Sequence, residues 1–275
     1  MASHEVLITI LEDFPLALFG SMIVGALCAF LGVYVVAKRI VFFGAVLTQI
    51  SVLGLAISFL PFVAMSHTVT SLLLTLAFAL GVSRMLTGKK FPKDAVLGIV
   101  FVAAIALRIL VLQVTPTVEV AEIEHLLRGD ILFVTPELFF PMLVVFLLVM
   151  GLHLVFFKEF QYISFDAETA RTQGFQAGFW EMLFYGTTGA VIALATHMVG
   201  DIFVFGFLVV PGFAAILLTR RVWRIFLVAL LIGVAAPAVG LFLAFLLDLP
   251  SSPASIAVAS VVLMGAWLIH LIRDR

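Results

Sequence analysis

The sequence KRIVFFGAVLTQISVLGLAISF occupies residues 38–59 and passes from two cations into a mainly apolar segment. Within it, small and polar residues recur at helical spacing. Gly44 is followed after four, seven and fourteen residues by Thr48, Ser51 and Ser58. Because these offsets bring side chains onto one face of an α-helix, the stretch predicts a membrane helix with a narrow polar stripe.

Two interpretations of this stripe remain open from the residues themselves. Small residues allow membrane helices to pack closely, and a few hydroxyls with one glutamine commonly find partners on neighbouring helices. Alternatively, the stripe lines a path for a substrate, and the candidate path residues are then Gly44, Thr48, Gln49 and Ser51, with Ala45 beside them. The rest of the chain is needed to decide between packing and a path.

The composition defines the class of protein. Of the 275 residues, 64% are hydrophobic and 11% are charged, whereas soluble domains carry about 25% charged residues. An all-α membrane bundle that crosses the bilayer several times is therefore expected. The net charge of −1, without a basic stripe, gives no indication of a nucleic-acid partner, and the single cysteine, Cys28, cannot form a disulfide within the chain.

Apolar segments of about 20 residues are long enough for a helix to cross the hydrocarbon core. Nine such spans are expected. Two of them are separated only by Val199 and Gly200, so eight spans with a re-entrant piece are the alternative. Without a low-complexity linker, residues 1–275 are expected to form one membrane domain. The expected spans are 14–37, 43–64, 68–86, 94–113, 136–157, 177–198, 201–218, 225–247 and 253–271.

The Lys and Arg residues predict how the spans are oriented. With nine spans, all of the 15 cations except Arg108 and Arg128 fall on one side, which the positive-inside rule makes cytoplasmic. The N-terminus is then outside and the C-terminus is cytoplasmic. The opposite side is acidic. These carboxylates could attract cations or a basic partner protein, or they could have no function there, since the positive-inside rule does not constrain acidic residues.

Motifs for enzymatic chemistry are absent. The only Gly-Lys pair, Gly88-Lys89, is followed by Lys90 and lacks the upstream glycine of a phosphate-binding loop. The chain is therefore expected not to bind ATP by itself in the usual way, not to be an enzyme, and to hold no cofactor of its own. A channel or carrier that works without an ATPase stays open as an alternative.

A few polar groups fall within the expected spans. Arg108 is a further candidate for the substrate path, because it needs protein or water around it unless it reaches the membrane surface. His197 and Asp201 are four residues apart around Gly200, so they could pair with each other, line the outer mouth or hold a metal ion together weakly. Glycine and proline in the seventh and eighth spans suit a transporter, because such breaks are tolerated where the backbone lines a cavity.

The chain resembles a known family, the permease subunits of zinc, manganese and iron ABC importers. The resemblance depends on the order and spacing of six segments rather than on any one of them. These segments are FFGAVLTQISVLGLA (42–56), DAVLGIVF (94–101), LLRGDILFVTPE (126–137), ISFDAETARTQGF (163–175), VGDIFVFGFLVVPGFAA (199–215) and GLFLAFLLDLPSSPA (240–254).

The resemblance implies a mechanism. Two copies of such a permease form the path in the bacterial cytoplasmic membrane, two ABC ATPase subunits bind beneath, and an extracytoplasmic solute-binding protein delivers the substrate. It also implies that residues 158–176 couple the permease to the ATPase through a short helix expected to begin near Ser164 or Asp166. The residues that match the family's coupling pattern are Phe165, Asp166, Glu168, Ala170 and Gly174.

The chain also departs from the family. In the second span the family usually has Gly-Asp-x-x-x-His, whose Asp and His can hold a divalent cation, and here those two positions are Ala45 and Gln49. Val102 stands where relatives often have His. The resemblance therefore implies import of a divalent metal ion with altered coordination. Import of a chelated metal or another small solute is the alternative.

Overall fold

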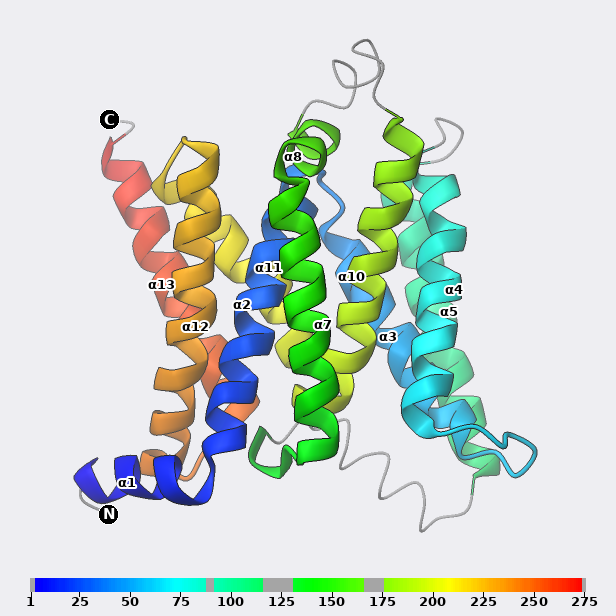
Figure 1. Cartoon of the computed structure of the whole chain (residues 1–275), viewed down its shortest axis with the longest axis horizontal. Helices are drawn as coiled ribbons and strands as arrows, with labels where there is room; N and C mark the ends of the chain where they lie inside the picture. The colour runs from blue at the N-terminus through cyan, green and yellow to red at the C-terminus, as the bar shows by residue number, and fades with distance from the viewer. Residues whose placement is uncertain (1–2, 88–91, 116–130, 166–175, 274–275) are drawn as a thin grey trace.

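The computed structural model describes residues 3–87, 92–115, 131–165 and 176–273. Every regular element in these ranges is helical and none is a strand (Figure 1). The predicted all-α class is confirmed. The elements are α1 (Ser3–Asp13), α2 (Pro15–Ala37), α3 (Val41–Ser58), α4 (His67–Thr87), α5 (Lys93–Val114), η1 (Ile131–Phe133), α7 (Pro136–Val155), α8 (Phe157–Phe165), α10 (Ala177–Val199), α11 (Asp201–Leu218), α12 (Val222–Leu247) and α13 (Ser251–Arg273).

Eight of the described helices are long and apolar enough to cross a membrane: α2, α3, α5, α7, α10, α11, α12 and α13. Helix α4 is apolar over the shorter stretch His67–Ser83 and packs against α3 and α10 within the bundle. These helices confirm the prediction of eight to nine membrane-spanning helices. Helices α10 and α11 are both long and apolar enough to cross a membrane, so the structure does not have the re-entrant piece that the sequence left open beside Val199 and Gly200.

Helix α1 was not expected from the hydropathy pattern. It lies across one end of the bundle, where Val6 and Ile10 are buried in a small cluster with Leu241 of α12 (Figure 1). The chain then turns at Phe14, and Pro15 occupies the first position of α2. Proline is well suited to that position because its missing N–H would have no partner inside the helix.

Helix α2 is at the centre of the core. Of its span, 72% is buried inside the bundle, against 11% for α5 and 17% for α13. It packs most extensively against α11 and α12. The peripheral helices expose large apolar side chains such as Ile99, Leu110 and Val261, as expected for surfaces that face lipid or another membrane subunit.

Glycine allows the helices around α2 to approach closely. A Cβ atom on Gly25 would meet the carbonyl oxygen of Gly233 on α12 and would lie 2.8 Å from Cγ of Pro237. A Cβ atom on Gly32 would meet the carbonyl oxygen of Leu208 on α11. Helix association in lipid depends on such close packing, since lipid tails are as apolar as the side chains that they would replace.

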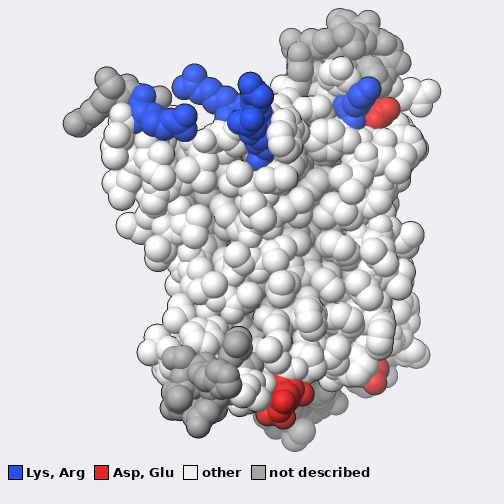
Figure 2. Space-filling model, turned by 60° about the vertical axis from the view of Figure 1, so that its left-hand side comes forward, with Lys and Arg blue, Asp and Glu red and all other residues white. Residues whose placement is uncertain are grey.

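Charge is separated between the two ends of the bundle. On the face shown in Figure 2, the Lys and Arg surface lies at one end, and most of the Asp and Glu surface lies at the other. The two chain termini also lie at opposite ends, with the C-terminus at the cationic end (Figures 1 and 2). This arrangement is what an odd number of crossings produces. The acidic loop between α5 and η1 lies mostly outside the described residues.

A substitution at Gly25 tests this packing. We expect Gly25→Ala to lower the stability of the purified protein in detergent by about 1–3 kcal/mol, because the added methyl group forces α2 and α12 apart. Thermal unfolding measures the change. Gly81→Ala is the matched control, because a Cβ atom there meets nothing within 4 Å, and it should leave the unfolding temperature unchanged or slightly raised. Equal behaviour of the two variants would contradict the packing argument.

Candidate functional site

A hollow of about 200 Å³ lies at the side of the bundle between α3, α5 and α11, and we refer to it as the α3–α11 hollow. Part of its lining is exposed, including Ile202, which is 60% exposed. The hollow is therefore open to the outside of the bundle. Its lining residues are Phe42, Ala45, Thr48, Gln49, Phe101, Asp201, Ile202 and Phe205.

The polar centre of this hollow is a contact between Gln49 and Asp201. Gln49 Nε2 donates a hydrogen bond of 3.0 Å to Asp201 Oδ2 across 152 residues of sequence. Gln49 Oε1 is buried and has no hydrogen-bond partner. Thr48 Oγ1 donates to the carbonyl oxygen of Ala45 at 2.9 Å, so its proton is used within α3. An amide oxygen and a carboxylate thus lie together beside Ala45, which lines the same hollow.

Gly200 brings Asp201 to this position. Helix α10 ends at Val199, and Gly200 has φ 86° and ψ 162°, a conformation that costs glycine little because it has no Cβ. Helix α11 then begins at Asp201. Asp201 Oδ1 accepts a hydrogen bond of 2.8 Å from the backbone N–H of Ile202. A carboxylate at this position is also stabilised by the positive end of the helix dipole.

His197 does not join Asp201. Its Nε2 atom is buried without a hydrogen-bond partner, and the hydrogen bonds of Asp201 go to Gln49 and Ile202 instead. The direct pair that the four-residue spacing suggested is therefore not formed, because Gly200 interrupts the helix on which that spacing depends. Among the described residues, no group of three or more His, Cys, Asp or Glu side chains is arranged to hold a metal ion.

The polar stripe on α3 contains residues of both kinds that the sequence left open: some line the hollow, and others pack against neighbouring helices. Thr48 and Gln49 line the hollow, but Gly44 and Ser51 are not among its lining residues. A Cβ atom on Gly44 would lie 3.2 Å from Leu208 on α11, and Ser51 shares a 2.9 Å hydrogen bond with Ser71 on α4. Those two positions pack helices together, so the substrate-path interpretation is restricted to Thr48 and Gln49.

Arg108 also lies apart from the hollow. It is on α5 but is not among the lining residues, whereas Phe101 of the same helix is. Arg108 is half-buried and makes no hydrogen bond or ion pair with a described residue. The structure thus gives Arg108 no contact with the polar centre of the site.

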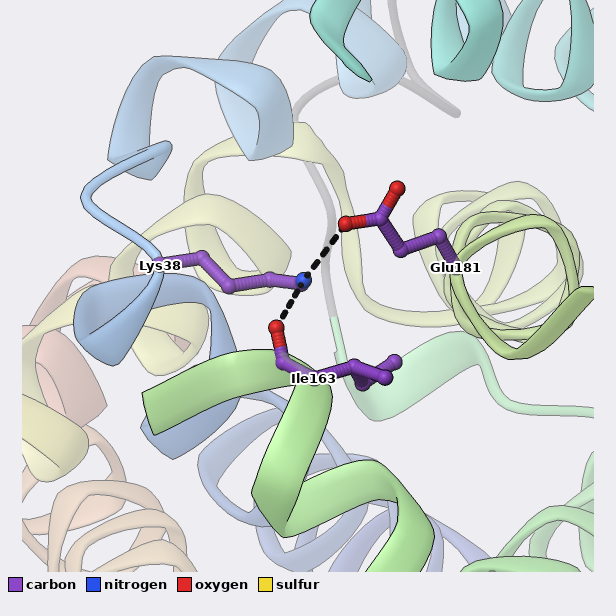
Figure 3. A network of polar contacts seen from close by, with 3 residues as sticks. All are labelled: Lys38, Ile163 and Glu181. Carbon is purple, nitrogen blue, oxygen red and sulfur yellow. Dashed lines mark hydrogen bonds and ion pairs between the residues drawn. The ribbon is translucent and has the colours of Figure 1, made fainter. Parts of the chain in front are cut away.

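A second polar cluster lies at the cationic end of the bundle (Figure 3). Lys38, just after α2, donates a 2.9 Å hydrogen bond from Nζ to the carbonyl oxygen of Ile163 on α8, and its Nζ lies 3.7 Å from Oε1 of Glu181 on α10. The two charged side chains are only 8% and 10% exposed. One buried cation therefore connects α2, α8 and α10.

This cluster fixes the start of the expected coupling segment. Helix α8 ends at Phe165, which is 42% exposed, and Ile163 in its last turn is held by Lys38. The sequence did not predict a helix over Phe157–Phe165. The helix predicted to begin near Ser164 or Asp166 falls on residues 166–175, so Asp166, Glu168, Ala170 and Gly174 lie outside the described residues.

The eight long apolar helices define a multi-pass membrane protein. The model of the ABC 3 transport family matches residues 12–270, almost the whole chain. The chain belongs to the ABC 3 transport family. This membership confirms the predicted family and the prediction of a transport subunit rather than an enzyme.

Several relatives are similar to this chain over most of their length. A probable iron transport system membrane protein of Haemophilus influenzae is 27% identical over 252 residues, covering 92% of this chain and 88% of the relative. The manganese transport system membrane protein MntC of Listeria innocua is 26% identical, covering 92% and 89%. The chelated iron transport system membrane protein YfeC of Yersinia pestis is 28% identical, covering 91% and 84%.

A solved structure has the same fold. PsaBC from Streptococcus pneumoniae, determined in complex with Fab, superposes with a TM-score of 0.83 at 20% identity. The match covers 96% of this chain and 95% of that chain. The fold found here is therefore that of a solved structure of similar length.

The buried ion pair can be tested by removing one partner or both. We expect Lys38→Met to destabilise the protein by about 3–5 kcal/mol, because the Glu181 carboxylate is left buried without its cation. The double variant Lys38→Met with Glu181→Leu should recover much of that loss, since no uncompensated charge remains. Thermal unfolding in detergent measures both. Lys158→Met, at an exposed position of α8, is the control and should change little. A double variant less stable than Lys38→Met would exclude this explanation.

Proposed function

We propose that the chain is the membrane-spanning subunit of an ATP-driven importer for a divalent transition metal ion. The observation that supports this proposal is the Gln49–Asp201 contact, because Gln49 stands at the position where the resemblance implies a metal-binding His. The carboxylate that is absent at Ala45 is supplied from α11 instead. The path is then lined by Thr48, Gln49 and Asp201.

The donor atoms in the hollow favour particular metals. Asp201 offers a carboxylate and Gln49 an amide oxygen, while no imidazole or thiolate is among the lining residues. Oxygen ligands suit manganese, whereas imidazole and thiolate suit zinc. Relatives named for manganese and iron transport agree with this preference. Manganese or ferrous iron is thus preferred to zinc as the substrate, and the chain holds no metal or cofactor of its own.

The partners follow from what the chain lacks. It has no phosphate-binding loop of its own, so two ABC ATPase subunits would supply ATP hydrolysis and would bind at residues 158–176. The open side of the α3–α11 hollow suits a second copy of the chain, which would bring a second Gln49–Asp201 pair. An extracytoplasmic solute-binding protein would deliver the metal at the acidic end.

The Lys and Arg residues at one end of the bundle determine the proposed orientation in the membrane. The cationic end of the bundle is assigned to the cytoplasm by the positive-inside rule, which leaves the N-terminus outside and the C-terminus inside. The protein would then be embedded in the lipid of the bacterial cytoplasmic membrane. In this orientation, Lys38 and α8 lie at the cytoplasmic end, where an ATPase could reach the coupling segment.

A chelated metal remains a second candidate substrate. A methyl group at Ala45 and an amide at Gln49 replace two metal ligands of the family, so the hollow holds a bare ion less strongly than its relatives would. One relative is named for chelated iron transport. A complexed metal needs fewer ligands from the protein, and this alternative is distinguished by the form of metal that enters the cell.

Uptake of radioactive manganese tests the site. We expect Asp201→Asn to reduce uptake by about tenfold or more, because the variant keeps the shape of the side chain but loses its anionic ligand. Asp248→Asn is the matched control. Asp248 is exposed in the left-handed region with φ 54°, which asparagine also tolerates.

Three outcomes separate the alternatives. Normal uptake by Asp201→Asn at normal protein levels would exclude the hollow from the path. Loss of uptake by Asp248→Asn as well would show a general effect of acidic residues. If deletion of the gene changes uptake only of chelated metal, the bare ion is not the substrate and the second candidate is correct.

The coupling segment is tested by co-purification. We expect Asp166→Ala with Glu168→Ala to release the ATPase from the purified permease, because both residues match the family's coupling pattern. The control is Asp94→Ala, an exposed carboxylate at the cationic end of α5. Retention of the ATPase by the double variant would place the docking surface elsewhere.

A further inference from the structure

A hollow of about 710 Å³ lies at the cationic end of the bundle. We call it the basic hollow. It is formed by the connection between α11 and α12 and by the last turns of α13. The four arginines in its lining are Arg220, Arg221, Arg224 and Arg273. The proposed path through the α3–α11 hollow does not use it.

The charge in the basic hollow is of one sign. No carboxylate is among its described lining residues. Arg224 lies 5.7 Å from the ring centroid of Trp223, and Arg273 Nη1 donates a 3.5 Å hydrogen bond to the carbonyl oxygen of Leu218. Guanidinium groups gathered in this way favour an anion, and they match phosphate oxygens especially well.

The rest of the lining is apolar. Trp223 is 56% exposed and Leu227 is 47% exposed, and both lie in the first turns of α12. A free phosphate ion would use the arginines but leave these two side chains in water. A ligand with an anionic head and an apolar tail would cover both parts of the hollow.

The position of the basic hollow identifies such a ligand. It lies at the ends of three spanning helices, α11, α12 and α13, where the hydrocarbon of a bilayer meets the headgroups. Tryptophan is enriched at that depth, and basic pockets between membrane helices on the cytoplasmic side bind anionic headgroups.

We propose that the basic hollow binds an anionic phospholipid of the cytoplasmic leaflet, with its phosphate among the arginines and its acyl chain along Trp223 and Leu227. Only the assignment to the cytoplasmic leaflet rests on the proposed orientation. Binding itself does not depend on the identity of the transported metal.

Quenching of Trp223 fluorescence tests the proposal. The full chain in neutral detergent micelles is titrated with phosphatidylglycerol or phosphatidylcholine, each brominated on its acyl chains near the headgroup. The difference between the unmodified chain and Trp223→Phe isolates the signal of this tryptophan. We expect brominated phosphatidylglycerol to quench the fluorescence of Trp223 at a mole fraction about tenfold lower than brominated phosphatidylcholine requires.

Matched variants identify the charges that are responsible. Arg221→Gln with Arg224→Gln should abolish the preference for phosphatidylglycerol. Lys93→Gln with Lys158→Gln removes the same amount of charge from exposed positions at the same end of the bundle. This control variant should keep the preference for phosphatidylglycerol. Because all four positions are exposed at the surface, loss of folding is not expected in either variant, and thermal unfolding checks this.

Inorganic phosphate distinguishes the two sources of the anionic group. At constant ionic strength, replacing chloride by millimolar phosphate should leave the quenching by phosphatidylglycerol unchanged. Selective loss of quenching with phosphate would assign the hollow to a free phosphate ion and overturn the lipid proposal. Equal quenching by the two lipids, or an unchanged preference in the arginine variant, would overturn it as well. None of these readouts involves metal uptake.

Discussion

The position of α11 between α2 and α3 depends on contacts made by one residue, Leu208. Its backbone carbonyl lies against Gly32 of α2, and its side chain lies against Gly44 of α3. Neither contact leaves room for a larger residue without a shift. Because Leu208 is seven residues, or about two helical turns, after Asp201 on the same helix, these contacts also set the position of Asp201 relative to Gln49. The polar centre of the site is thus determined by apolar packing.

The carboxylate in the α3–α11 hollow belongs to a different helix from the one that the family resemblance implies. In the family pattern both ligands lie on the second span, one turn apart. In this chain the carboxylate comes from the start of α11 and the neutral oxygen donor from α3. A contact between two helices differs physically from two ligands on one helix, because it changes whenever the helices move relative to each other. A transport protein can use such a contact, since its substrate must be released as well as held.

The sequence predicted those parts of the structure that depend on the bilayer. The length and apolarity of the spans, and the placement of cations at one end, follow from transfer free energies that act on each segment separately. Helix α1 was missed because its few apolar positions contact α12, far along the chain. The hydrogen bond between Lys38 and Ile163 joins residues 125 positions apart, so no local pattern in the sequence predicts it.

For the site, the sequence singled out Thr48, Gln49 and Asp201 but could not show that Gln49 and Asp201 meet. The four-residue spacing instead suggested His197 as the partner of Asp201, because it assumes a continuous helix. The sequence places a boundary between two spans at Val199 and Gly200, but it does not give the backbone conformation of Gly200, on which the position of Asp201 depends. Gly44 and Ser51 share the stripe with Thr48, yet they pack against α11 and α4, a difference that periodicity along one helix cannot reveal.

The connection between α10 and α11 consists of one residue, and this limits how the protein can open. With no slack at Gly200, the end of α10 and the start of α11 must travel together in any rearrangement. Ser252 adds to this restraint, since its hydroxyl donates a 2.9 Å hydrogen bond to the carbonyl oxygen of Val199. Helix α3 is joined to α11 at this end by the hydrogen bond between Gln49 and Asp201. Any movement that separates α3 from the start of α11 would therefore have to break this hydrogen bond.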